Sequence, residues 1–99
     1  MLTVSGIAKS TESQKTYNKG STHGFTLFSK DENLDDILGD IETFMNGHHW
    51  DDIVIVEAQN IDHVEDLSHK VLRQGANKAL DEGMSLVIHN KPVEEAGAA

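Results

Sequence analysis

Carboxylates are the most numerous side chains in this sequence that could do chemistry, and they are concentrated in one part of the chain. Of the 17 acidic residues, twelve lie between residues 31 and 66, a segment that contains no Lys or Arg. Four of these acids have the spacing of one broad helix face: Glu32, Asp35, Asp36 and Asp40. Like charges four residues apart cost a helix about 0.2–0.5 kcal/mol per pair, so helix stability does not explain the arrangement. The segment is either a solvated surface or a recognition surface for a basic partner.

The same carboxylates offer pairs for general acid–base catalysis. The candidates are Asp35, Asp36 and Asp40 on the expected helix, and Asp51 with Asp52 after it. Such catalysis requires one carboxyl group in a pocket that excludes water and raises its pKa. The helix residues are expected opposite the apolar stripe, where they would face solvent. An enzyme is therefore the least favoured class of function.

Nucleophilic catalysis is disfavoured by the composition and by the motifs. The chain has no cysteine and no G-x-S-x-G sequence. Ser21 and Ser29 lie near His23 in the sequence, but proximity along the chain does not make a catalytic pair. We interpret these residues as loop hydroxyls and a surface histidine, and no catalytic residue is predicted.

Six histidines raise the question of a metal site. The densest group of ligand types is His48-His49 with Asp51 and Asp52. Adjacent residues rarely both point at one ion, and the sequence has neither an H-x-x-x-H pair nor an H-E-x-x-H motif. Neither a metal nor another cofactor is predicted. Histidines that titrate at about pH 6 are the favoured interpretation.

One helix is expected to carry the acidic surface. Apolar residues recur at intervals of three and four from residue 34 to residue 45, which is typical of a helix with one buried face. Ser29 and Glu32 have the spacing of a capping box, and Gly47 follows the last periodic residue, so the helix is predicted at about 30–46. Trp50 follows it and would be an aromatic anchor for a partner if exposed. Burial at the edge of the core is the favoured alternative for Trp50.

The remaining elements follow from shorter patterns. The β-branched run Ile53–Val56 is apolar on both faces, which predicts a buried central strand. A second helix is expected at about 62–82 and ends at Gly83. Gly75 within it indicates either a close approach to the sheet or a kink. Strands are also expected at 2–8, 25–28 and 84–89, with a turn at 18–20 and an optional short strand at 15–17.

These elements give the order β(β)β-α-β-α-β in a single domain of residues 1–92, followed by a frayed tail at 93–99. Each strand–helix–strand unit is expected to cross over right-handedly and to give parallel neighbours. The predicted fold is α/β (α+β), a two-layer sandwich in which a mixed sheet of four or five strands carries both helices on one face. The open face would then present Leu2, Val4, Phe25 and Leu27.

Part of the sequence resembles the barstar-type ribonuclease inhibitors. The resemblance covers roughly residues 31–90 as an α-β-α-β order. It is carried by the tetrad Glu32-Asn33-Leu34-Asp35, the strand Ile53–Val56, the helix segments Val71-Leu72 and Lys78–Gly83, and the strand Ser85–Ile88.

In that family an acidic helix and the loop before it plug the cationic active site of a nuclease. The resemblance implies that Asn33 and Asp35, with Asp36 or Asp40 as the further acid, contact the partner. The chain departs from the family in its expected N-terminal hairpin. It also has Ser29-Lys30 and Leu38-Gly39 where the family presents aromatic residues.

Composition limits the partners and the location. A net charge of −9 disfavours binding to nucleic acid or to an anionic membrane, because phosphate contacts need Lys and Arg. No apolar segment approaches the roughly 18–20 residues of a membrane span, and the N-terminus lacks a secretory signal pattern. A cytoplasmic protein is therefore expected.

The sequence thus predicts a non-enzymatic acidic protein that neutralises a basic partner, such as a nuclease. Immunity proteins, nuclease inhibitors and nucleic-acid mimics from mobile genetic elements share this physics. The alternative is a stand-alone oligomeric domain or a small-ligand binder with incidental acidity, in which the open sheet face would form a homodimer. The predicted partner-binding residues are Asn33, Asp35, Asp36, Asp40 and Trp50.

Overall fold

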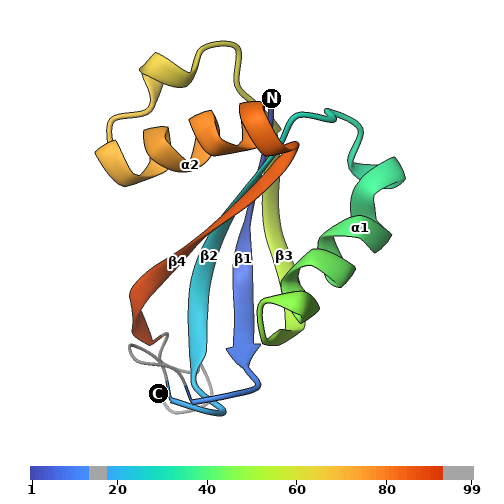
Figure 1. Cartoon of the computed structure of the whole chain (residues 1–99), viewed down its shortest axis with the longest axis vertical. Coiled ribbons are helices and arrows are strands. Elements are labelled where there is room, and N and C mark those ends of the chain that lie inside the picture. The colour runs from blue at the N-terminus through green and yellow to red at the C-terminus, as the bar shows by residue number, and fades with distance from the viewer. Residues whose placement is uncertain (14–17, 93–99) are drawn as a thin grey trace.

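The computed structural model describes residues 1–13 and 18–92. The predicted optional strand at 15–17 and the predicted tail at 93–99 lie outside these described residues. Elsewhere the predicted order of strands and helices is confirmed (Figure 1). The elements are β1 (Leu2–Ser10), β2 (Thr22–Ser29), α1 (Leu34–Gly47), β3 (Trp50–Asn60), the single 3₁₀ turn η1 (Val64–Asp66), α2 (Lys70–Glu82) and β4 (Met84–Pro92).

The strands form one sheet of four, in the order β3-β1-β2-β4, and every neighbouring pair is antiparallel. The hairpin of β1 and β2 occupies the centre, and its predicted turn is confirmed by the hydrogen bond from the Ser21 N–H to the Asn18 carbonyl. Helix α1 connects β2 to β3, which lie on either side of β1. Helix α2 connects β3 to β4, which lie at the two opposite edges of the sheet. Strands joined by a helix are therefore not neighbours, and the prediction of parallel neighbours in a mixed sheet is wrong.

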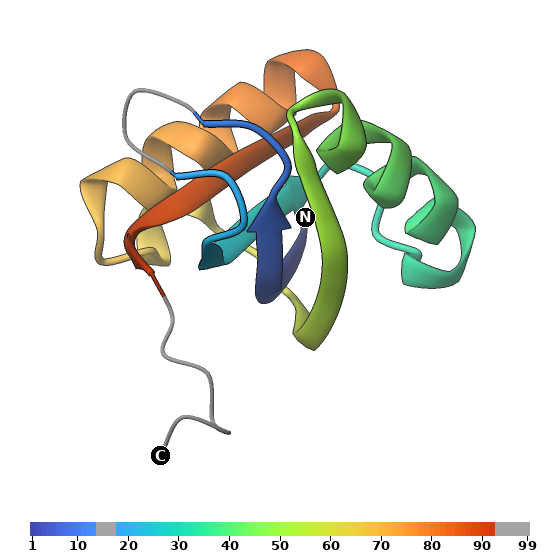
Figure 2. The ribbon, with the colours of Figure 1, turned by 90° about the horizontal axis from the view of Figure 1, so that it is seen from below.

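The two helices lie on opposite faces of this sheet. The buried side of α1 packs on the face that carries Leu27 and Leu86, whereas the buried side of α2 packs on the face that carries Phe28 and Val87. Neighbouring residues of a strand point to opposite faces, so these adjacent pairs separate the two helices. Figures 1 and 2 show α1 beside β3 and α2 along β4. The prediction of a two-layer sandwich with both helices on one face is wrong.

The residues expected on an open sheet face are instead the centre of the core. Leu2 is 4 % exposed and Val4, Phe25 and Leu27 are at most 1 % exposed, because the apolar stripe of α1 covers them. This face is therefore closed to a second copy. The uncovered part of the sheet lies on the other face, over β1 and β3, since α2 packs on β2 and β4.

Strand β3 is an edge strand and not the buried central strand that its apolar run predicts. Ile53 and Ile55 are half-buried against the α1 side, whereas Val54 and Val56 are 52 % and 72 % exposed. A run that is apolar on both faces is typical of a strand at the centre of a sheet. In this sheet the hairpin of β1 and β2 occupies the centre, and β3 lies at the edge beside β1.

Both helices begin later than predicted. Asn33, not Ser29, caps α1, because its side-chain oxygen accepts the Asp35 N–H at 3.1 Å. Ser29 is instead the last residue of β2 and is buried. The segment before α2 forms η1, and α2 itself starts at Lys70 after an uncapped His69.

The C-terminal end of α2 and its close approach to the sheet agree with the prediction. Gly83 terminates the helix with φ of 95°, a conformation that favours glycine. Gly75 lies against the sheet, where an added Cβ would be 2.7 Å from Val87 Cγ2 and 3.2 Å from the Phe28 ring. The Ser85 hydroxyl donates a hydrogen bond to the Gly75 carbonyl oxygen, so helix and strand approach closely at this point.

Candidate functional site

The exposed side of α1 carries the acidic residues that the sequence singles out. Asp35, Asp36 and Asp40 are exposed, as their positions opposite the buried Ile37 and Ile41 require. None of the three forms an ion pair with any residue that the structure describes. No basic side chain among the described residues is therefore paired with this acidic side of α1.

A groove next to these residues was not predicted from the sequence. It lies between α1 and the edge strand β3 and has a volume of about 370 Å³. We call it the acidic groove, and its lining residues are Leu38, Gly39, Ile41, Glu42, Asp51, Asp52, Ile53 and Ile55.

The acidic groove combines apolar and charged groups. Leu38 is 44 % exposed and Ile53 and Ile55 are half-buried, which gives the groove an apolar floor. Glu42 and Asp51 form no ion pair within the described residues. Asp52 is partly neutralised, since its carboxylate lies 3.8 Å from Lys9 Nζ, and both side chains are substantially exposed. Only the tertiary contact between α1 and β3 brings these residues together.

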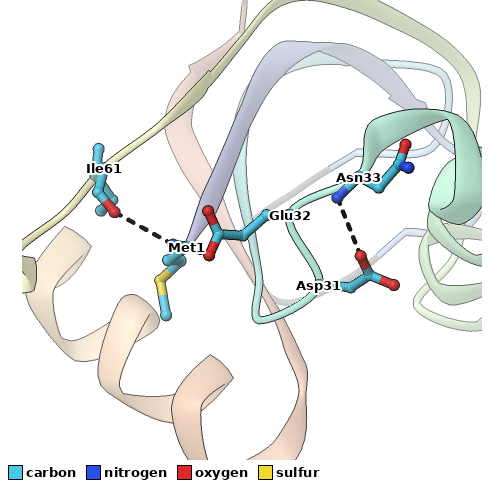
Figure 3. A network of polar contacts seen from close by, with 5 residues as sticks. All are labelled: Met1, Asp31, Glu32, Asn33 and Ile61. Carbon is cyan, nitrogen blue, oxygen red and sulfur yellow. Dashed lines mark hydrogen bonds and ion pairs between the residues drawn. The ribbon is translucent and has the colours of Figure 1, made fainter.

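The turn before α1 holds Asn33 in a local network (Figure 3). The Asn33 N–H donates to Asp31 Oδ1 at 3.0 Å, while the Asn33 side chain caps the helix. The amino group of Met1 lies 3.6 Å from Glu32 Oε1 and donates to the Ile61 carbonyl oxygen at 3.2 Å. Asn33 is exposed, but its N–H, its carbonyl oxygen and its side-chain oxygen already have hydrogen-bond partners, so it has a structural role in this turn.

Trp50 does not meet the condition for an aromatic anchor, because it is only 2 % exposed. Its ring makes an edge contact with His23, with ring centroids 5.6 Å apart. The alternative interpretation of Trp50 as a core residue is the one that its burial supports. Its burial at the start of β3 helps to hold this edge strand beneath the end of α1.

His23 is a core residue and not a surface histidine. It is 1 % exposed, with Nδ1 2.8 Å from the His89 carbonyl oxygen and Nε2 3.0 Å from Ser21 Oγ. Because a carbonyl only accepts, Nδ1 carries the proton and donates. Ser21 Oγ donates its proton to the Asn18 carbonyl oxygen at 2.6 Å, which closes the β1–β2 turn. The Ser21–His23 contact thus belongs to a network of backbone contacts that ties β2 to β4.

The histidines nearest to the acidic residues have other contacts. His48 packs on Phe44 with ring centroids 4.6 Å apart, and His49 Nδ1 lies 3.6 Å from Glu12 Oε2. Within the described ranges, no group of three or more His, Asp or Glu side chains is arranged to hold a metal ion.

A second cavity, of about 500 Å³, lies over the α1 side of β4. Its walls are largely apolar and aromatic, and the Lys78–Glu82 ion pair lies among them. The other lining residues are Phe44, His48, Trp50, Met84, Ser85, Leu86 and Ile88.

Comparisons of the chain with protein-family models, with curated proteins and with solved structures find no match. In the described part of the chain, neither helix has the length and apolarity needed to cross a membrane.

Proposed function

We propose that this chain is a non-enzymatic binding protein that neutralises a basic partner protein through α1 and the acidic groove. The observation that supports this proposal is the set of unpaired carboxylates beside an apolar floor. Glu42 and Asp51 line the groove, and Asp35, Asp36 and Asp40 are exposed on α1, the helix that forms one of its walls.

The two kinds of group serve different parts of binding. Excess negative charge accelerates the encounter with a basic protein and orients it, and the effect weakens as salt rises. Apolar side chains such as Leu38 and Ile53 provide contact area that charges alone do not. A surface that served only solubility would not need the apolar floor.

The partner class that best fits is a protein with a cationic groove, such as a nuclease or another protein that handles nucleic acid. Its phosphate-binding Lys and Arg residues would meet the carboxylates of the inhibitor. The resemblance to the barstar-type inhibitors stays a prediction, and it points to the same surface.

Affinity capture tests the proposal. The bait is the full chain, and the matched bait carries Asp35→Lys, Asp36→Lys and Asp40→Lys. We expect the unchanged chain to retain a basic protein from a native lysate at low salt and to release it as salt rises. The charge-reversed bait should lose that protein, because it removes the long-range attraction.

A control bait with Asp62→Lys, Glu65→Lys and Asp81→Lys makes the same change in net charge at a different surface. It should retain the same basic protein almost as well as the unchanged chain. Equal retention by all three baits would overturn the proposal.

A second function is favoured by the cavity over β4. Its volume of about 500 Å³ is in the range of small-molecule sites, and Phe44, Trp50 and Leu86 give it apolar walls. A small-ligand binder would make the acidity incidental. This second function would be favoured if the bait with Asp35→Lys, Asp36→Lys and Asp40→Lys retained every protein that the unchanged chain retains.

A further inference from the structure

The free edge of β3 runs along the acidic groove. The carbonyl oxygen of Val54 faces β1, since a Cβ placed on Gly6 would lie only 2.0 Å from it. Backbone groups of successive strand residues point to alternate edges. Ile55 follows Val54 in continuous register, so its N–H and C=O groups face away from β1, along the unpaired edge, whereas Ile53 lies at the next register shift.

Ile53 and Ile55 line the acidic groove with their side chains. A strand placed along this edge would direct every second side chain toward the groove, over Leu38 and beside Glu42. A lysine or arginine suits these positions, because its aliphatic stem covers apolar surface while its charge reaches a carboxylate.

The intervening side chains of such a strand would point to the other face. There Val54 and Val56 are 52 % and 72 % exposed, beyond the part of the sheet that α2 covers. Apolar residues suit these positions. The edge thus has a groove with acidic walls on one face and two exposed valines on the other.

We propose that the edge of β3 accepts an extended segment of the basic partner as a fifth strand, in which basic and apolar residues alternate. This proposal rests on the proposed function and adds the mode of recognition. Main-chain hydrogen bonds to Ile55 would supply affinity, and the alternating side chains would supply specificity.

Charge argues for a partner segment and against a second copy at this edge. Two copies paired through β3 would bring two sets of the same carboxylates together, and each chain has a net charge of −9. Acidic residues on an exposed strand disfavour self-pairing. A basic strand reverses the sign of this interaction.

Two synthetic peptides of equal composition and charge test the proposal. One is acetyl-(Lys-Val)4-amide, and the other is acetyl-Lys-Lys-Val-Val-Lys-Lys-Val-Val-amide, in which the alternation is broken. Each is titrated at low salt into the ¹⁵N-labelled full chain. We expect the alternating peptide to bind about tenfold more tightly, a difference of about 1.4 kcal/mol. It should also slow hydrogen exchange at the Ile55 amide.

Variants of the full chain locate the interaction. Glu42→Gln with Asp51→Asn should weaken binding of the alternating peptide, whereas the matched pair Asp62→Asn with Asp81→Asn should not. Retained binding by the groove variant would overturn the proposal.

The remaining outcomes separate this proposal from the proposed function. Equal affinities for the two peptides, unchanged exchange at Ile55, or no binding of either peptide would overturn strand addition. Such results would leave the charge-dependent capture of a partner as it stands. A dimer of the free chain with a protected Ile55 amide would assign the edge to a second copy and also overturn the proposal.

Discussion

At the scale of single residues, Gly6 sets the distance between the central hairpin and the edge that borders the acidic groove. The strand register shifts next to it, between Ser5 and Gly6, and again between Ile7 and Lys9. Such shifts are typical of β-bulges, which bend the strand and leave one residue of it without a partner across the ladder. A glycine is needed because the Val54 carbonyl oxygen occupies the space of a side chain.

Gly6→Ala is expected to destabilise the fold by more than about 3 kcal/mol, since the new methyl group would force β3 away from β1. Urea denaturation followed by circular dichroism measures the change in the free energy of unfolding. Gly24→Ala in β2 is the matched control, because its Cβ would meet its nearest neighbour, the His89 ring, at 3.5 Å. Equal stabilities of the two variants would contradict this account of Gly6.

Trp50 and His23 show the limit of reasoning from residue type. Both were candidates for the surface, and both are buried in contact with each other. The rings of Trp and His are stable both at the surface and in the core, provided that their polar atoms find hydrogen-bond partners. The tertiary fold therefore decides whether such a residue is exposed or buried.

At the scale of elements, the two helices differ in how their first turns are stabilised. Helix α1 has a side-chain cap at Asn33 and two acids in its first turn, Asp35 and Asp36. Helix α2 has neither, although its backbone starts regularly with the Arg73 N–H donating to the His69 carbonyl oxygen at 3.0 Å. The N-terminus of α2 therefore lacks interactions that α1 possesses.

His69→Asp is expected to stabilise the protein by about 1 kcal/mol. His69 is exposed and has φ −91° and ψ 129°, the extended conformation of a capping residue, so an aspartate could accept a free N–H of the first turn. Thermal or urea denaturation measures the gain. His69→Ala is the control, and an aspartate variant no more stable than the alanine variant would contradict the expectation.

At the scale of the whole molecule, the charge is divided unevenly between surfaces. The acids of α1 and the acidic groove lie together at one edge of the sheet, and few bases of the described chain approach them. Their mutual repulsion opposes folding, and dissolved salt reduces it.

Raising NaCl from about 20 mM to about 300 mM should therefore increase the free energy of unfolding by several tenths of a kcal/mol to about 1 kcal/mol. A variant with Asp35→Asn, Asp36→Asn and Asp40→Asn should be more stable at low salt and should gain less from added salt. Denaturation at the two salt concentrations measures both effects. The same gain in the variant and in the unchanged chain would show that the repulsion lies elsewhere.

The local part of this structure was predictable. The helix at α1, its exposed acids, the close approach at Gly75 and the end of α2 at Gly83 all follow from patterns within a few turns of chain. The acidic surface of the candidate site was predicted for the same reason. The groove beside it was not, because Leu38 and Ile53 meet only through the packing of α1 on β3.

The sequence by itself determined the order of the helices and strands and which side of α1 is charged, since both depend on periodicity along one segment. The tertiary structure decided that β3 is an edge, that α1 and α2 cover opposite faces, and that the acids border an apolar groove. These choices depend on which distant strands pair, and a strand with apolar residues on both faces fits more than one position in a sheet. Only the burial of all the apolar faces together selects one arrangement.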